Sequence, residues 1–167
     1  MGLAKVYLKL TELIDDGKSI DIVYLDFKKA FDSIPHERLL IKMKGYGITG
    51  SVLHWVRSFL SGRKQRVRVG NSYSSETNVT SGIPQGSILG PVLFTIFIND
   101  LPEMIDINCQ VFADDTKIYE DSRYKAKIQK DLYNLQEWTE KWNLYFNVAK
   151  CKVMHVGKKN PNMKIAR

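Results

Sequence analysis

Cysteine and histidine are scarce in this sequence, which limits the kinds of site that it can hold. The 167 residues contain two cysteines, Cys109 and Cys151, and three histidines, with no grouping at the spacing of a zinc site. Both cysteines have apolar neighbours. The sequence therefore predicts two reduced thiols and no disulfide framework, as is typical of proteins of the cytoplasm or nucleus.

Long hydrophobic runs are also missing. No stretch approaches the roughly 18 uninterrupted apolar residues of a membrane-spanning helix, and the first residues lack the layout of a signal peptide. Hydrophobic residues make up 44% of a chain that also carries charges of both signs. We therefore expect no membrane partner, an intracellular location in the nucleus or cytoplasm, and one globular domain over residues 1–167.

Acidic side chains are absent from two stretches of a chain whose net charge is +7. Residues 1 to 140 are balanced in charge, so the excess lies in residues 141 to 167, the C-terminal basic block. A second acid-free stretch, residues 51 to 75, is the central basic block. Such runs are commonly solvated surface, but two of them favour a polyanionic partner, most simply nucleic acid. The residues that would contact it are Arg63, Lys64, Arg66, Arg68, Lys158 and Lys159.

Hydrophobic periodicity and turn residues predict the order of the elements. Helices are expected at residues 3–14, 35–47, 49–62 and 88–100 and after Asp121 or Ser122. Strands are expected at residues 19–27 and 150–157, with hairpins at 64–79 and 109–120. The hairpin at 64–79 should have a basic face, because arginine alternates with valine there. This order predicts an α+β fold, in which helices pack on one face of a mainly antiparallel sheet.

The apolar faces of the predicted helices indicate parts of the core. Trp55, Trp138 and Trp142 lie on such faces and are expected to be buried. His155 has no second ligand at a suitable spacing, so it is not predicted to bind metal. Asp32 is expected to be a helix cap or a local ion-pair partner, without a chemical role.

Three aspartates lie at the ends of predicted strands. Asp26 ends the strand at 19–27, and Asp114 and Asp115 form the turn of the hairpin at 109–120. If these strands are neighbours, three carboxylates meet at one end of the sheet, where they need cations to stay ionised together. Oxygen ligands favour Mg²⁺ or Mn²⁺, and two ions about 3.5–4 Å apart serve phosphoryl or nucleotidyl transfer. Taken alone, these residues are more typical of a common turn and a solvated strand end.

Four longer motifs contain or accompany these aspartates. They are "YLDFKKAFDSIPHERLL", "SGIPQGSILGPVLF", "FADDT" and "NLYFNVAKCKVM", and they lie within residues 20 to 156. In content, order and spacing they resemble the four palm motifs of reverse transcriptases, in particular those of non-LTR retrotransposons. The resemblance implies a polymerase palm, the activity of an RNA-directed DNA polymerase, and two Mg²⁺ or Mn²⁺ ions as cofactors. It implies an RNA template, a DNA primer and a dNTP as partners.

The resemblance also implies roles at the metal. Asp26 and Asp114 resemble the metal-binding aspartates, and Asp115 is their neighbour in the catalytic pair. Phe27 would offer its backbone carbonyl to the metal. Lys150 matches the lysine that is proposed to protonate the leaving pyrophosphate, although a lysine in this place is almost equally typical of a phosphate-contacting surface.

Three further residues match positions that contact the incoming nucleotide. Phe31 resembles the aromatic residue that blocks a ribose 2′-hydroxyl and so selects deoxynucleotides. Gln85 and Gly86 match the loop that touches the nucleotide and the template. Without the resemblance, Phe31 would be assigned to the core and the loop would be a tight turn before a helix.

The chain departs from the family pattern at both ends. Reverse transcriptases have fingers before the first palm motif and a thumb after the fourth. Here only about nineteen residues precede the strand that carries Asp26, and the sequence ends at Arg167. We therefore expect one palm domain with the fingers largely missing and the thumb missing, which would need those segments or a partner chain.

Two other functions are compatible with parts of the sequence. One is a non-catalytic remnant whose basic blocks still bind RNA or DNA. The other is a different two-metal phosphotransfer enzyme, such as a nuclease or a nucleotide cyclase. The "SGIPQGS" loop argues against the second, because it fits contact with template and dNTP and has no use in hydrolysis.

Overall fold

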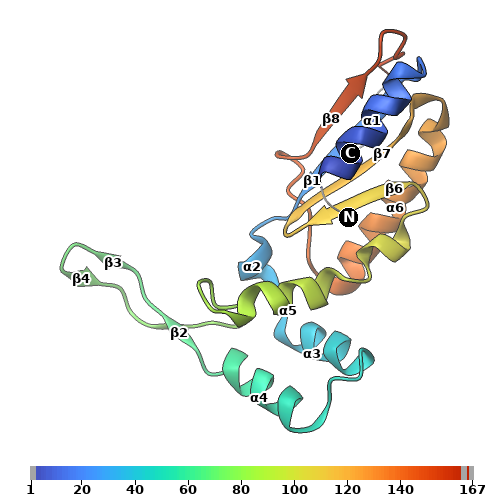
Figure 1. Ribbon diagram of the computed structural model, residues 1–167. Coiled ribbons are helices and arrows are strands. Elements are labelled where there is room, and N and C mark those ends of the chain that lie inside the picture. The colour runs from blue at the N-terminus through green and yellow to red at the C-terminus, as the bar shows by residue number, and fades with distance from the viewer. Residues whose placement is uncertain (1–2, 163–164, 166–167) are drawn as a thin grey trace. The chain divides into compact units, whose positions relative to one another are not determined.

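The computed structural model describes residues 3–162 and residue 165, and the chain forms two compact units. The first unit comprises Met1–Lys28, Asp100–Lys141 and Tyr145–Arg167, and the second comprises Lys29–Asn99 and Trp142–Leu144. Figure 1 labels most of the helices and strands of both units. The predicted helices and strands all form, most of them within one or two residues of the expected bounds.

The first unit is built on a four-stranded antiparallel sheet with the strand order β6-β7-β1-β8. Its strands are β1 (Ile20–Asp26), β6 (Asn108–Phe112), β7 (Asp115–Asp121) and β8 (Lys152–Val156). The two central strands, β1 and β7, come from distant parts of the sequence and pair along their whole length. The helical elements of this unit are α1 (Leu3–Asp15), η1 (Leu101–Met104), η2 (Ser122–Tyr124) and α6 (Lys125–Trp142).

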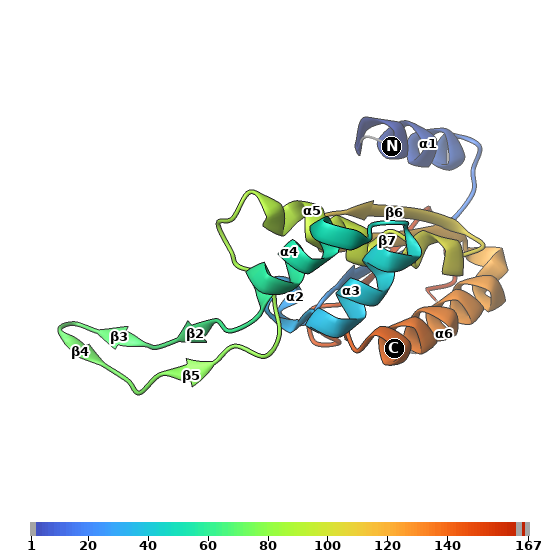
Figure 2. The ribbon, with the colours of Figure 1, turned by 90° about the horizontal axis from the view of Figure 1, so that it is seen from below.

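Helices cover both faces of this sheet. Strand alternation places Ile20 and Ile22 on one face, where they form a buried cluster with Tyr119 and contact Leu10 and Leu13 of α1. On the other face, Val23 and Leu25 share the lining of an apolar cavity with residues of α6. Figure 2 shows α1 and α6 on opposite sides of the strands. The predicted α+β class is confirmed, but the expectation that helices pack on one face is wrong. Both faces of β1 carry apolar side chains, so each face must be buried by a helix.

Helix α6 buries one stripe of its surface. Its buried residues lie three, four or seven positions apart, as one helical face requires: Ile128, Asp131, Leu135, Trp138 and Thr139. Asp131 is fully buried, and its Oδ2 accepts the backbone N–H groups of Asp106 and Ile107 at 3.0 Å each. The carboxylate therefore ties the helix to the segment that enters β6.

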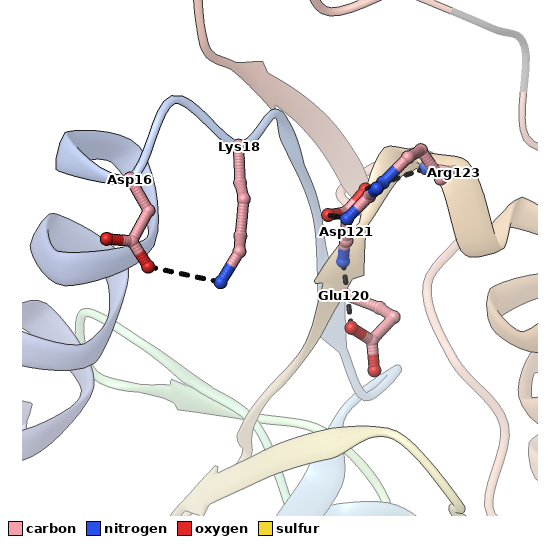
Figure 3. Close-up of polar contacts among 5 residues, drawn as sticks. All are labelled: Asp16, Lys18, Glu120, Asp121 and Arg123. Atoms are coloured by element: carbon pink, nitrogen blue, oxygen red, sulfur yellow. Dashed lines mark hydrogen bonds and ion pairs between the residues drawn. The ribbon is translucent and has the colours of Figure 1, made fainter.

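Charged side chains lie at the end of the sheet remote from Asp26 (Figure 3). Asp121 lies opposite Ile20, at the start of β1. Its carboxylate accepts three hydrogen bonds from Arg123: backbone N–H at 3.0 Å, Nε at 3.0 Å and Nη2 at 2.8 Å. The hydrogen bonds from Arg123 lower the pKa of Asp121.

The second unit contains four helices and a hairpin. The helices are α2 (Ala30–Ser33), α3 (His36–Gly45), α4 (Gly50–Leu60) and α5 (Leu89–Ile98). The hairpin consists of β2 (Lys64–Gln65), β3 (Arg68–Val69), β4 (Ser72–Tyr73) and β5 (Thr77–Asn78). Leu93, Phe94 and Phe97 of α5 are buried, as the apolar run predicts, and Pro91 is tolerated in the first turn.

The predictions for tryptophan and cysteine were partly correct. Trp138 is buried, but Trp55 is 55% exposed and stacks on Phe59 of the same helix, so its assignment to the core was wrong. Both cysteines are free thiols, as expected, and burial raises the pKa of Cys109 to about 11. Among the described residues, no helix combines the length and the apolar character that crossing a membrane requires.

Candidate functional site: a carboxylate edge and a nucleotide loop

Two of the predicted aspartates face each other across neighbouring strands. Asp26 is the last residue of β1, Asp115 is the first residue of β7, and the register pairs them directly. Asp114 lies in the turn between β6 and β7, where Ala113 adopts a left-handed backbone with φ of 53°. The chain thus reverses at Ala113 and Asp114, one residue earlier than the predicted Asp-Asp turn. We call Asp26, Asp114 and Asp115 the carboxylate edge.

Asp26 is the least satisfied of the polar groups at this edge. Its Oδ1 is buried and has no hydrogen-bond partner among the described residues. Its Oδ2 lies 3.5 Å from Nζ of Lys150, which is largely exposed. A buried carboxylate oxygen without a donor is costly, so this atom is suited to receiving a cation or a donor that binds there.

The segment after α6 is fastened to the end of β1. The N–H of Lys28 donates to the carbonyl of Tyr145 at 2.8 Å, and the N–H of Asn147 donates to the carbonyl of Asp26 at 2.7 Å. The rings of Phe27 and Phe146 stack with centroids 4.5 Å apart. These contacts place Lys150 beside Asp26, so the structure joins the first and fourth motifs at the carboxylate edge.

The carboxylate edge is not a ready-made metal site. No group of three or more histidine, cysteine, aspartate or glutamate side chains in the described part of the chain is close enough to hold a metal ion. Asp115 is exposed and Asp114 is half-buried. The backbone therefore brings the three aspartates to one end of the sheet, whereas the predicted convergence of their side chains is not present.

In the second unit, backbone hydrogen bonds join the two segments that carry the residues predicted to contact a nucleotide. The N–H groups of Gly82 and Ile83 donate to the carbonyls of Ile34 and Phe31 at 2.8 and 2.7 Å. The loop of residues 80–87, which we call the nucleotide loop, is thereby fixed to the segment that carries Phe31. Gln85 and Gly86 are exposed on this loop.

Gly82 allows this close approach. It has a φ of +84°, and a Cβ at this position would lie 2.6 Å from the carbonyl oxygen of Asp32. The carbonyl of Gly82 is contacted by His36 Nε2 at 2.8 Å and accepts a hydrogen bond from Arg63 Nη2. Arg63 also donates from Nε to the carbonyl of Leu60 at 3.0 Å, and burial lowers its pKa. Its guanidinium therefore braces the nucleotide loop, a role that the prediction of a nucleic-acid contact did not include.

Asp32 orients one of the predicted nucleotide-binding residues. Its Oδ1 accepts a hydrogen bond from Nε2 of Gln85 at 3.0 Å. The sequence assigned no chemistry to Asp32, because its partner lies 53 positions away and no local pattern pairs them. Phe31, next to it, is half-buried and stacks on Phe94 with ring centroids 4.8 Å apart. One part of the Phe31 side chain is thus packed and another part stays accessible.

The remaining predicted residues are basic and exposed. Lys64 forms an ion pair with Glu76 at 3.2 Å, and Arg66 and Arg68 lie over the ring of Tyr73. Lys158 and Lys159 follow β8 on the surface of the first unit. Lys164 and Arg167, which the sequence counts in the C-terminal basic block, lie outside the described residues.

The sequence also predicted no role for Asp21, a buried polar residue of the sheet. Asp21 on β1 is fully buried, and its Oδ1 lies 2.7 Å from Nδ1 of His155 and accepts a hydrogen bond from Nδ2 of Asn160 at 2.8 Å. His155 is therefore paired with a buried carboxylate. The alternation of β1 and β8 could have suggested the pair, because Asp21 and His155 are register partners.

A family model, described as reverse transcriptase (RNA-dependent DNA polymerase), matches residues 6–165, almost the whole chain. The chain belongs to the reverse transcriptase family. The resemblance seen in the four motifs is thereby confirmed.

Relatives of this reverse transcriptase chain come from transposable elements. It is 31% identical over 158 residues to a probable RNA-directed DNA polymerase from transposon X-element of Drosophila melanogaster, covering 89% of this chain and 17% of the relative. It is 34% identical over 140 residues to the RNA-directed DNA polymerase from mobile element jockey of the same species, covering 77% and 15%. The chain thus spans about a sixth of the length of the relatives that it matches.

Solved telomerase structures share the fold of this reverse transcriptase chain. Apo telomerase from Candida tropicalis superposes with a TM-score of 0.69 at 13% identity, covering 94% of this chain and 35% of that one. Telomerase from Candida albicans, in complex with a fragment of telomeric RNA, gives a TM-score of 0.69 at 14% identity, covering 98% and 32%. At this identity the likeness concerns the fold alone, and it agrees with the predicted polymerase palm.

Proposed function

We propose that the chain is the palm of an RNA-directed DNA polymerase from a non-LTR retrotransposon-like element. In the proposed reaction, a primer 3′-hydroxyl attacks the α-phosphate of a dNTP opposite an RNA template, and pyrophosphate leaves. The observation that carries the proposal is the direct pairing of Asp26 with Asp115, next to Asp114, in a member of the reverse transcriptase family. A nuclear or cytoplasmic location belongs to the same proposal.

The donor set at the carboxylate edge fits a hard divalent cation. The three side chains offer oxygen ligands only, and Oδ1 of Asp26 is buried without a partner among the described residues. Mg²⁺ or Mn²⁺ would be held by Asp26, Asp114, Asp115 and the carbonyl of Phe27. When bound, two such ions would supply the positive charge that offsets the carboxylates and the reacting phosphate oxygens.

Lys150 is the proposed proton donor. Its ammonium lies 3.5 Å from Oδ2 of Asp26 and is largely exposed, so the long side chain has room to turn towards a leaving pyrophosphate. A proton given from Nζ to a pyrophosphate oxygen would reduce the charge on the leaving group. This role requires the fourth motif to lie beside the first. The hydrogen bond from the N–H of Asn147 to the carbonyl of Asp26 supports that arrangement.

The nucleotide loop would position the incoming dNTP. The side chain of Gln85 is held by Asp32, and Gly86 presents backbone without a side chain. The accessible part of Phe31 would exclude a 2′-hydroxyl. Arg63, Lys64, Arg66, Arg68, Lys158 and Lys159 are proposed to bind the RNA template and DNA primer. Further polymerase segments or a partner chain would complete the binding site for the template and primer.

The second candidate is a remnant that binds nucleic acid without turnover, for which the exposed basic side chains of Arg66, Arg68, Lys158 and Lys159 are sufficient. Primer extension separates the two. The purified chain is incubated with oligo(dT) on poly(rA), dTTP and either Mg²⁺ or Mn²⁺. The polymerase proposal predicts extension that Asp115→Asn abolishes and that Glu103→Gln, a change of an exposed acid on η1, leaves intact.

The other outcomes of this assay identify the alternatives. Binding of the labelled primer–template without extension, also after the chain is joined to the fingers and thumb of a related enzyme, supports the remnant. Shortening of the primer would indicate a nuclease and contradict the polymerase proposal. Extension that survives Asp115→Asn would assign the activity to a contaminant.

A further inference from the structure

The hairpin of the second unit stands away from the helices of that unit (Figures 1 and 2). Its strands pair in two short stretches. In the first, Lys64 and Gln65 pair with Asn78 and Thr77; in the second, Arg68 and Val69 pair with Tyr73 and Ser72. Between them, the N–H of Val67 donates to Oγ of Ser74 at 2.9 Å, and the N–H of Ser74 donates to the carbonyl of Val67 at 2.9 Å. The ribbon is therefore continuous, and its residues from Lys64 to Asn78 are exposed.

The two faces of the ribbon differ in chemistry. Arg68 is the cross-strand partner of Tyr73, so the two side chains share a face. The guanidinium carbon of Arg66 lies 4.2 Å from the centroid of the Tyr73 ring, and that of Arg68 lies 5.6 Å from it. Strand alternation directs Val67 and Val69 to the other side, where they are 66% and 74% exposed. One face is thus cationic and aromatic, and the other is aliphatic.

The cationic face is held in place before any ligand binds. Nε of Arg68 donates to the carbonyl of Gly70 at 2.8 Å, which fixes the guanidinium next to the turn. Cation–π attraction holds both guanidinium groups close to the ring of Tyr73. Tyr73 itself is 51% exposed. Three flat π-systems are therefore presented together on the surface, within a block that contains no acid from residue 51 to residue 75.

Flat cationic and aromatic side chains fit the exposed faces of unpaired bases, with the guanidinium charges near the phosphates. A duplex hides its base faces in the stack. In addition, an A-form helix, as in double-stranded RNA, has a deep and narrow major groove that side chains cannot read. A B-DNA major groove would admit a two-stranded ribbon, but it would use base-edge contacts instead of the ring of Tyr73.

We propose that the face formed by Arg66, Arg68 and Tyr73 binds an unpaired RNA strand by stacking. This inference rests on the proposed function, which makes RNA the template, and it adds a binding mode and the residue Tyr73. The hairpin holds template that has not yet been paired with product. Tyr73 supplies stacking, and the two arginines supply both planes and charge.

The test is fluorescence anisotropy of labelled single-stranded RNA with the intact chain, without metal or dNTP. Tyr73→Ala should weaken binding about five- to tenfold, because stacking on an aromatic residue supports roughly this difference for one base. Tyr73→Phe keeps the ring and should bind like the parent. Val69→Ala, on the opposite face, is the matched control and should also bind like the parent.

Arginine variants separate stacking from charge. Arg66→Lys keeps the charge and loses the plane, so it should weaken RNA binding while leaving the slope of log affinity against log salt unchanged. Arg66→Gln should weaken binding and also flatten that slope. Circular dichroism spectra of all variants should match the parent, since the exchanged side chains are exposed.

Several results would overturn the inference. The first is binding of single-stranded RNA that Tyr73→Ala leaves unchanged. The second is a loss of affinity in Tyr73→Ala that is as large for an RNA–DNA hybrid or a B-DNA duplex as for single-stranded RNA. The third is absence of RNA binding by the parent chain. The readout is independent of the carboxylate edge. RNA binding that depends on Tyr73, in a chain that binds no Mn²⁺ at the carboxylate edge and extends no primer even when joined to the fingers and thumb of a related enzyme, would refute the polymerase proposal and leave this inference standing.

Discussion

Asp115 lies directly opposite Asp26, so that two carboxylates occupy one cross-strand position of an antiparallel pair. Cross-strand pairs contribute roughly 0.2–1 kcal/mol each, and like charges directly opposite each other are destabilising. Two aspartates paired in this way lower the free energy of unfolding unless a cation lies near them. We interpret the pair as stability given up for a site that binds cations.

The first prediction follows from this repulsion. In metal-free buffer of low ionic strength, Asp115→Asn should raise Tm by up to about 3 °C, because it removes one of the two facing charges. Glu103→Gln should leave Tm unchanged. Differential scanning fluorimetry measures both. A lower Tm for Asp115→Asn in the absence of metal would show that the carboxylate stabilises the fold and would contradict this interpretation.

The second prediction concerns the nucleotide loop. Gly82→Ala places a Cβ 2.6 Å from the carbonyl oxygen of Asp32, whereas Gly86→Ala meets no atom within 4 Å. Both glycines have positive φ, at +84° and +78°, so both variants carry about 1–3 kcal/mol of backbone strain. Gly82→Ala should therefore lower Tm clearly more than Gly86→Ala. Equal losses would mean that the close approach to Asp32 is unimportant.

The sequence predicted this region only in part. The glycine-rich loop and the nearby phenylalanine were found from the motifs, because their chemistry is local. The bonds of Gln85 to Asp32 and of Arg63 to Gly82 join residues 53 and 19 positions apart, and no periodicity connects such partners. The same limit applies to the faces of the sheet: β1 was seen to be apolar, but only its pairing shows that both faces need a helix.

The third prediction concerns sugar selection by Phe31. The residue is half-buried and stacked on Phe94, so Phe31→Val should destabilise the chain by much less than the roughly 3–5 kcal/mol of a fully buried Phe→Ala change. It should also admit ribonucleotides. Primer extension with UTP in place of dTTP measures this. A strongly destabilised variant with unchanged exclusion of UTP would assign Phe31 to the core and remove it from the site.

The fourth prediction concerns acid stability at the far end of the sheet. Arg123 lowers the pKa of Asp121, so the folded-state pKa lies below the unfolded value of about 3.9. The ion pair therefore contributes stability above the unfolded pKa and loses it as pH falls through the folded pKa.

Arg123→Gln tests this contribution. Its Tm should be lower than that of the parent at pH 7, and the difference should shrink below about pH 4 as Asp121 takes up its proton. Lys44→Gln, a change of an exposed lysine on α3, should show no such dependence on pH. A constant difference from pH 7 to pH 3 would show that Arg123 acts through packing alone.

Binding of Mn²⁺ to the carboxylate edge tests the central claim most directly. Titration of the chain with Mn²⁺ in the presence of dTTP is followed by the electron paramagnetic resonance of free Mn²⁺, and a titration of dTTP alone is subtracted. The difference counts the ions bound to the chain without requiring turnover. We predict saturable binding, with up to two ions per chain, that Asp26→Asn and Asp114→Asn each reduce at least tenfold in affinity and that Glu103→Gln leaves unchanged. Mn²⁺ binding that is absent, or that is equal in Asp26→Asn and the parent, would contradict the assignment of this edge as a polymerase centre.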